Sequence, residues 1–211
     1  MIKHTKFFGI LLCLCSCSLL EEIPVANYVY TTMKAGIINE PPKIYDSDFI
    51  DSFPYKSINA QLNNGTNALM VLSYIRDGYY EYISSDGIKL ILKNGILVET
   101  IGLPNDFKRY PDPDLLNKIL AEKKVQESFS GSFDFFNPRA FNLTSLSSFR
   151  SKKDEIIYNG TPLVVKIIEE TIILSEIKRK FTFTYYIYDQ KIIRAEYSTL
   201  YNPKISIFVI K

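Results

Sequence analysis

The chain has 211 residues, with 25 basic and 23 acidic side chains, one histidine and three cysteines. His4 and all three cysteines lie within the first 17 residues. The rest of the chain therefore cannot supply a Ser-His-Asp triad, a Cys-His pair, a histidine zinc site or a disulfide. The near balance of charge argues against nucleic-acid binding, which needs clustered basic residues. We expect no cofactor, no metal and no nucleic-acid partner.

The first residues resemble an export signal. Lys3 and Lys6 form a basic start, and residues 7–14 are an apolar run too short to span a bilayer as a helix. We predict a signal peptide at residues 1–16. Its removal would take away two of the 25 basic residues and no acidic ones, leaving 23 of each sign.

Residues 14–17, Leu-Cys-Ser-Cys, resemble the bacterial lipobox, in which small residues precede an acylated cysteine. Cys13 and Cys15 each follow a leucine, which is too large, whereas Cys17 follows Ser16. We predict that Cys17 carries the lipid, which would hold the protein on a membrane. The alternatives are an ordinary secretory signal or a stray apolar terminus.

Ser18 follows the predicted lipidation site. By analogy with enterobacterial lipoproteins, the lack of Asp at this position favours the outer membrane, with the protein facing the periplasm. We expect residues 17–24 to form a lipidated tether and residues 25–211 a single domain. Within that domain, residues 25–37 are a helical candidate, which the pair Pro41-Pro42 would end.

From residue 44 onward the pattern is mostly that of strands. Turn signals rich in Asn, Asp and Gly recur every eight to ten residues between runs of Ile, Val, Leu and Tyr, which is typical of an antiparallel meander. The strands predicted in this part are residues 57–62, 68–75, 79–84, 88–93 and 96–101.

The middle of the chain contains a helix signal. Asp112-Pro113-Asp114 precedes Leu115, Leu116, Ile119 and Leu120, which share one helical face, so Asp112 or Asp114 is a plausible N-cap. Capping favours a structural role for these aspartates over metal binding. A second meander follows, with strands predicted at residues 145–150, 154–158, 163–170, 172–180, 181–188, 192–200 and 204–210.

Some of these strands are apolar on both faces, such as residues 163–168 and 205–210. Strands of this kind indicate a sheet that curls around helices or closes on itself. We therefore predict a mainly β fold: one strongly curved antiparallel sheet or incomplete barrel, with a few helices filling or capping it.

Several motifs resemble the group 4 capsule polysaccharide lipoprotein family, also called GfcB or YjbF. They comprise residues 53–57 (FPYKS), 61–65 (QLNNG), 71–75 (VLSYI), 82–87 (YISSDG), 93–95 (KNG) and 102–104 (GLP), with a weaker similarity over 184–187 and 205–211. The resemblance implies a curled sheet, similar to the half-open barrels of lipoprotein carriers. It also implies an outer-membrane lipoprotein that acts with capsule or exopolysaccharide secretion machinery, and it supplies no catalytic residues.

Three functions follow as hypotheses. The first is a non-catalytic accessory factor in polysaccharide secretion, whose partners are secretion proteins and the polysaccharide itself. The second is a carrier that shelters a lipid or lipoprotein acyl chain. The third is an enzyme that uses two carboxylates, as in glycoside hydrolysis; the acidic residues considered are Asp77, Glu81, Asp86, Asp112 and Asp114.

Three tyrosines are candidate contact residues: Tyr82, Tyr186 and Tyr188. Alternation over residues 181–188 predicts that Phe181, Phe183, Tyr185 and Ile187 face the core, which places Tyr186 and Tyr188 on the other face. The family that these motifs resemble favours tryptophan near Tyr82 and Tyr186. Against a contact role, large aromatic residues on strands are usually packing residues.

The acylation of Cys17 can be measured directly. Mass spectrometry of the protein purified from membranes should find a first peptide that begins at Cys17 and carries added lipid mass, and Cys17→Ala should release a folded protein from the membrane. An uncut N-terminus, or an unmodified Cys17, would contradict the prediction.

Overall fold

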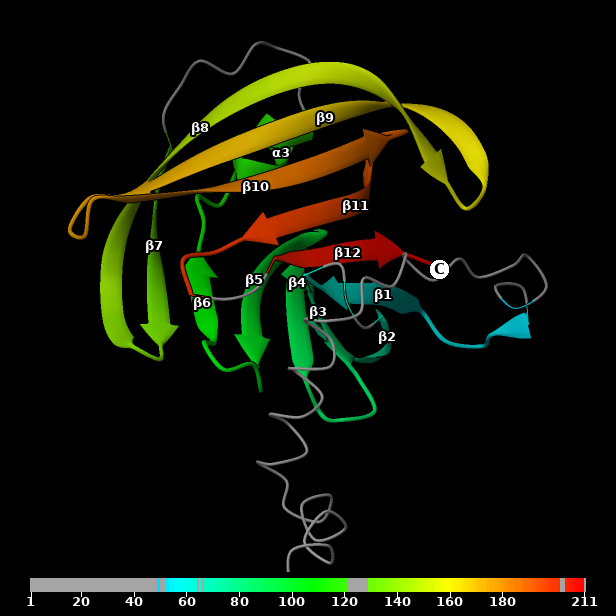
Figure 1. Ribbon diagram of the computed structural model, residues 1–211, viewed down its shortest axis with the longest axis horizontal. Helices are drawn as coiled ribbons and strands as arrows, with labels where there is room; N and C mark the ends of the chain where they lie inside the picture. Colours follow the sequence, from blue (N-terminus) through cyan, green and yellow to red (C-terminus); the bar gives the residue numbers. More distant parts are fainter. Residues whose placement is uncertain are drawn as a thin grey trace, which may run out of the picture. The chain divides into compact units, whose positions relative to one another are not determined.

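The computed structural model describes residues 49, 52–63, 65, 67–120, 129–201 and 204–210. Cys17, the predicted signal, tether and helix at 25–37 lie outside these residues. The described residues include twelve strands and the helix α3 (Figure 1). In chain order these elements are β1 Ser57–Leu62, β2 Asn67–Arg76, β3 Tyr79–Ile83, β4 Lys89–Lys93, β5 Ile96–Ile101, β6 Phe107–Tyr110, α3 Leu115–Leu120, β7 Phe129–Phe136, β8 Arg139–Tyr158, β9 Thr161–Leu174, β10 Arg179–Tyr188, β11 Lys191–Ser198 and β12 Ile205–Val209.

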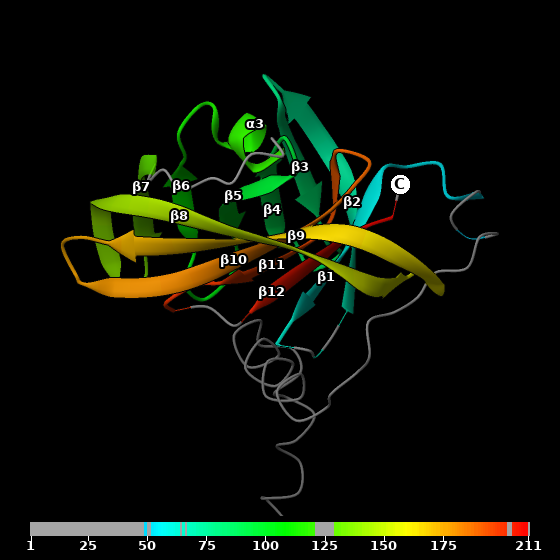
Figure 2. The same ribbon diagram turned by 90° about the horizontal axis from the view of Figure 1, so that it is seen from above.

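The strands form one closed antiparallel barrel. Each strand pairs with the strands before and after it in the chain, and β1 also pairs with β12. In that closing pair, Ile58 lies opposite Val209 and Leu62 opposite Ile205. The long strands β8 and β9 sweep across the barrel, as Figures 1 and 2 show. The prediction of a strongly curved antiparallel sheet is confirmed.

Residues with positive φ form the tight turns. At Asn94-Gly95 the φ angles are 52° and 83°, the left-handed conformation that Asn tolerates and Gly adopts without strain. Asp77-Gly78 and Asn159-Gly160 have similar angles. The predicted turns at these positions are therefore confirmed, and strands β1 and β5 have the predicted bounds.

Two predicted strand breaks are wrong. The sequence pattern predicted a break at residues 151–153, between two strands. β8 instead continues through these residues, because Ser151, Lys152 and Lys153 pair in register with β9. β9 likewise continues through Thr171, whose branched side chain suits a strand. The turn between β9 and β10 lies at residues 175–178, inside the strand predicted at residues 172–180, and Lys178 there has φ 51°. That predicted strand is therefore wrong beyond Leu174 up to Lys178.

The prediction also omitted β6 and β7. β6 has only four residues, two of them basic, so its composition is a weak strand signal. β7 contains Gly131 and two serines, although Phe129, Phe133 and Phe135 are buried along it. Pairing with β5 and β8, rather than local propensity, explains these strands.

Aromatic side chains fill much of the core. Phe181, Phe183, Tyr185 and Ile187 are all buried, which confirms the predicted inner face of β10. The Phe183 ring packs edge-on against Tyr197, with centroids 4.8 Å apart. The predicted helix after Asp114 is confirmed as α3, which adds Leu115 and Ile119 to the same buried cluster.

Phe183→Ala should lower the free energy of unfolding by about 3–5 kcal/mol, because it leaves a cavity among buried rings. The matched control is Ile157→Ala, since Ile157 is 65% exposed; its effect should stay within about 0.5 kcal/mol. Urea unfolding of both variants measures the difference, and equal losses would contradict the described core.

Candidate functional site

A charged cluster lies inside the barrel. Arg109 of β6, Glu170 of β9 and Tyr185 of β10 are each at least 96% buried. Arg109 Nη1 donates to Glu170 Oε2 (3.1 Å) and to the Tyr185 hydroxyl (3.3 Å), while Nη2 donates to Glu170 Oε1. The Tyr185 hydroxyl in turn donates to Glu170 Oε2 (2.7 Å). The cluster therefore joins β6 to the paired strands β9 and β10, which lie about 60 residues further along the chain.

Electrostatics favour a protonated Arg109 and a neutral Tyr185 in this cluster. Burial opposes the charge of Arg109, but the carboxylate of Glu170 outweighs it, so the pKa of Arg109 is raised. Burial and the same carboxylate raise the pKa of Tyr185 well above its ordinary value. The guanidinium also lies 5.5 Å from the Phe133 ring and 5.4 Å from the Phe183 ring. The cluster is therefore charged, internally paired and enclosed by core side chains.

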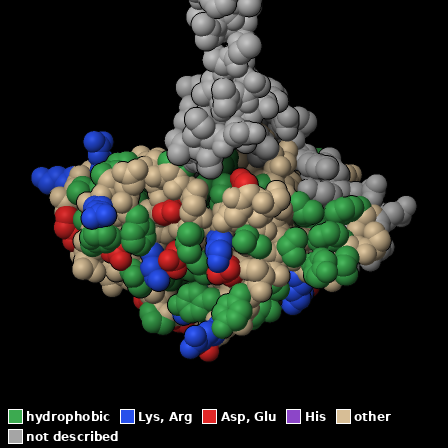
Figure 3. Space-filling model, turned by 90° about the horizontal axis from the view of Figure 1, so that it is seen from below, with side chains coloured by type: hydrophobic (Ala, Val, Ile, Leu, Met, Phe, Trp, Pro, Cys, Tyr) green, Lys and Arg blue, Asp and Glu red, His purple; other side chains and the backbone are tan. Residues whose placement is uncertain are grey.

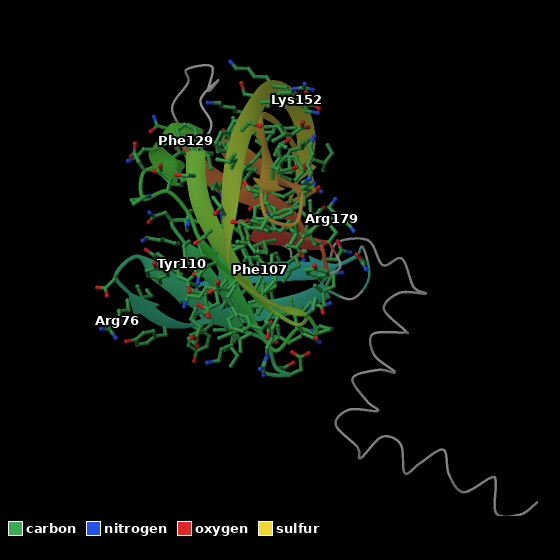
Figure 4. All side chains as sticks on the ribbon, turned by 90° about the vertical axis from the view of Figure 1, so that its left-hand side faces the viewer. Arg76, Phe107, Tyr110, Phe129, Lys152 and Arg179 are labelled. Atoms are coloured by element: carbon green, nitrogen blue, oxygen red, sulfur yellow. The ribbon has the colours of Figure 1, made fainter. Side chains whose placement is uncertain are left out.

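A groove on the flank of the barrel is the candidate binding site. It has a volume of about 650 Å³ and is lined by residues of β2–β6 and of the segment that leads into α3. Figure 4 shows Arg76 and Tyr110, both of which line the groove, on the same side of the molecule. In Figure 2, α3 and the β2–β3 turn also lie on one side.

Two β-bulges adjoin the groove. In β5, Ile91 pairs with Glu99 and Leu92 with Leu97, so Val98 is an extra residue. Val98 and Glu99 therefore both line the groove, although they are consecutive in the strand. In β2, Ser73 is the extra residue, and its hydroxyl donates to Glu81 Oε1 (3.0 Å).

Ion pairs hold the carboxylates of the groove in place. Lys89 Nζ lies 3.0 Å from Glu81 Oε1, and Lys108 Nζ lies 3.2 Å from Glu99 Oε2. The hydrogen bond from Lys89 lowers the pKa of Glu81, and the hydrogen bond to Glu99 raises the pKa of Lys108. Glu81 and Lys108 therefore stay ionised near neutral pH.

Tyrosines supply the large surfaces of the groove. Tyr74, Tyr79 and Tyr110 line it and are 56%, 40% and 46% exposed. Lys93 Nζ donates to the Tyr79 hydroxyl (3.3 Å) and lies 4.7 Å from its ring centroid. The Tyr110 hydroxyl donates to Asp134 Oδ2 (3.2 Å). The sequence analysis singled out none of these tyrosines. Tyr110 lies on β6, which was not predicted, and Tyr74 follows the bulge at Ser73.

The acidic residues considered for catalysis do not form one site. Three of the five, Asp77, Glu81 and Asp112, line the groove, whereas Asp86 bonds Ser84 in the β3–β4 turn. Asp77 has φ 52° in its turn. Asp112 Oδ1 accepts from Asp114 N (2.8 Å) before α3, which agrees with the structural role predicted for this segment.

The three candidate contact tyrosines are in different environments. Tyr82 is 9% exposed and belongs to the core cluster, so little of it is available to a partner. Tyr186 is half-buried, with the Arg194 guanidinium 4.7 Å from its ring, and donates to Glu196 (3.3 Å). Tyr188 is 46% exposed. The structure does not bring these three together.

Further features of the described residues concern metals and membranes. No group of three or more His, Cys, Asp or Glu side chains in this part of the chain could hold a metal ion. None of its helices has the length and apolar character needed to cross a bilayer. On the face in Figure 3, hydrophobic side chains form small groups among charged and polar ones.

Comparisons with known proteins agree with this class of fold. The chain resembles the crystal structure of the hypothetical lipoprotein YmcC from Escherichia coli (K12), with a TM-score of 0.63, 18% sequence identity, and coverage of 85% of this chain and 94% of that chain. This likeness shows the fold. The fold is thus that of an antiparallel barrel found in a bacterial lipoprotein.

The family follows from the sequence match. Residues 30–197 match the family described as "Group 4 capsule polysaccharide lipoprotein gfcB, YjbF", and the chain belongs to this family. The curated protein "Uncharacterized lipoprotein GfcB" of Escherichia coli (strain K12) is 28% identical over 75 residues, or 36% of this chain. The match spans about a third (35%) of that relative's length.

Glu170→Gln should destabilise the barrel by about 3–5 kcal/mol, because it leaves the buried Arg109 without a negative partner. The control is the double variant Arg109→Met with Glu170→Gln, which also removes the unpaired positive charge of Arg109. It should regain much of the lost free energy of unfolding. Urea unfolding measures both. A loss below about 1 kcal/mol for the single variant would contradict a fully desolvated pair.

Proposed function

We propose that the protein is a non-catalytic accessory factor in the production or secretion of a capsule or exopolysaccharide. Its membership of the capsule polysaccharide lipoprotein family over residues 30–197 carries the proposal. The groove with exposed tyrosines and ionised side chains supports a binding role. Its expected partners are polysaccharide secretion proteins and the polysaccharide.

The proposed location is the outer membrane, facing the periplasm, with a lipid on Cys17 as the anchor. The lipobox-like residues 14–17 support the anchor, and the family description supports a lipoprotein. A lipid anchor would keep the barrel close to the site of export, so that a weak contact with polymer or partner is made repeatedly at high effective concentration.

The protonation of the groove favours binding over hydrolysis. A glycosidase needs one carboxylic acid with a raised pKa as its proton donor. The pKa of Glu81 is instead lowered by its hydrogen bond from Lys89. Asp77 pairs with Arg76 at the exposed turn.

The filled interior favours a surface binding role over a carrier. A carrier would shelter an acyl chain in a continuous apolar cavity. Here the rings of Phe107, Phe133, Phe135 and Phe183 are fully buried in the core, and the Arg109–Glu170 pair lies among them. Burying an acyl chain there would require displacing these side chains.

Deletion of the gene should reduce or alter the secreted polysaccharide while sugar-precursor synthesis continues, because an accessory factor acts after the building blocks are made. Polymer amount and length in the culture medium, with nucleotide-sugar levels as the control, test this. Normal amounts of normal-length polymer from the deletion strain would overturn the proposal.

An activity assay on the same polymer distinguishes an enzyme from a non-catalytic factor. Purified protein incubated with it should produce no new reducing ends. Reducing ends that accumulate with time, and that disappear in Glu81→Gln, would assign the protein to the polysaccharide-modifying enzymes.

A further inference from the structure

The groove combines flat aromatic surfaces with hydrogen-bonding groups. Tyr79 lies on β3 and Tyr110 on β6, three strand spacings apart, which corresponds to roughly 14 Å across the sheet. Tyr74 of β2 lies beyond Tyr79, opposite Glu81 in the register. All three tyrosines are at least 40% exposed, unlike the fully buried Tyr185 and Tyr197. The exposed rings therefore belong to the groove surface rather than to the core.

The polar groups between these rings keep hydrogen-bonding capacity. The paired carboxylates Glu81 and Glu99 each have two oxygens that accept several hydrogen bonds, and their lysine partners use only part of this capacity. Lys93 has three ammonium donors, of which the Tyr79 hydroxyl accepts one. The groove thus presents both acceptors and donors beside apolar ring faces.

The charge of the groove selects among ligand classes. Arg76, Lys93 and Lys108 lie in the same groove as the carboxylates of Asp77, Glu81, Glu99 and Asp112. This mixture of signs suits neither a polyanion nor a polycation. The charged groups distributed along it do not suit a lipid chain either.

A peptide that binds by strand addition is also disfavoured. Such a peptide needs an open sheet edge. The described strands form a closed barrel in which every strand has two neighbours. A ligand must therefore bind through side chains on the outer surface.

We infer that the groove binds an oligosaccharide segment of the exported polymer, neutral or sparsely charged, an inference that rests on the proposed function. Sugar rings have apolar C–H faces that pack on tyrosine rings, and hydroxyl edges that donate to carboxylates and accept from lysines. The volume of about 650 Å³ lies within the range of roughly 300–1,000 Å³ typical of small-ligand sites. Tyr79 and Tyr110 are the two stacking platforms, and Glu81, Lys93 and Glu99 bind the hydroxyls.

Oligosaccharides prepared by partial hydrolysis of the source strain's secreted polysaccharide are the probe. Titration calorimetry should detect binding to the full-length lipid-free protein made as Cys17→Ala. In that background, the double variant Tyr79→Ala with Tyr110→Ala should bind at least about tenfold more weakly, as when aromatic anchors are removed. Tyr188→Ala is the matched control, because Tyr188 has the same exposure as Tyr110, 46%, but lies outside the groove. It should bind within about twofold of the parent.

Chemical-shift mapping of the unsubstituted groove keeps the test valid if the double variant fails to fold. Added oligosaccharide should shift the amide signals of β3, β5 and β6. Shifts confined to β10 and β11, loss of binding in Tyr188→Ala alone, or no binding to the parent protein would each overturn the inference.

Secretion assays separate this inference from the proposed function. A deletion strain that secretes normally refutes the accessory role, whatever the groove binds. If the deletion strain has a secretion defect, the folded Tyr79→Ala, Tyr110→Ala variant can be tested for its ability to correct it. Full correction would leave the accessory role in place but would overturn the inference that the protein needs an oligosaccharide site at this groove.

Discussion

The pairing of β1 with β12 is the constraint on which the rest of the structure depends. It gives β1 a hydrogen-bonded neighbour on both sides, and Ile58 and Ala60 of that strand belong to the core cluster. Closure leaves the described strands no open edge, and it fixes their register around the whole barrel. The outward residues of β2–β6 are thereby held in fixed positions, which a groove assembled from five strands requires.

Closure also creates an interior that side chains must fill. A barrel of many strands is wide, so small side chains alone would leave voids. Large rings from β6, β7, β10 and β11 occupy this space, and the Arg109–Glu170–Tyr185 cluster connects strands across it. With the interior occupied in this way, the tyrosine-lined groove lies on the outer surface of the barrel.

Local signals in the sequence predicted the features that depend on neighbouring residues. The turn at Asn94-Gly95 depends on two residues that accept positive φ, and the inner face of β10 depends on simple alternation. The Arg109–Glu170 pair could not be predicted, because its members are 61 residues apart and the barrel alone brings them together. The groove was missed for a related reason: the bulge at Val98 changes which side chains face outward, and the weakly patterned β6 supplies Tyr110.

The closing pair has a consequence for how the chain folds. Ile58 and Val209 lie near opposite ends of the described chain, so the contact between them requires a very large loop to close. Barrels dominated by such distant contacts fold slowly. A chain delivered from its N-terminus, as in export through a pore, would have to wait for β12 before β1 gained its second neighbour. Until then β1 would expose unpaired backbone groups, and this is the stage at which the protein would need protection from aggregation.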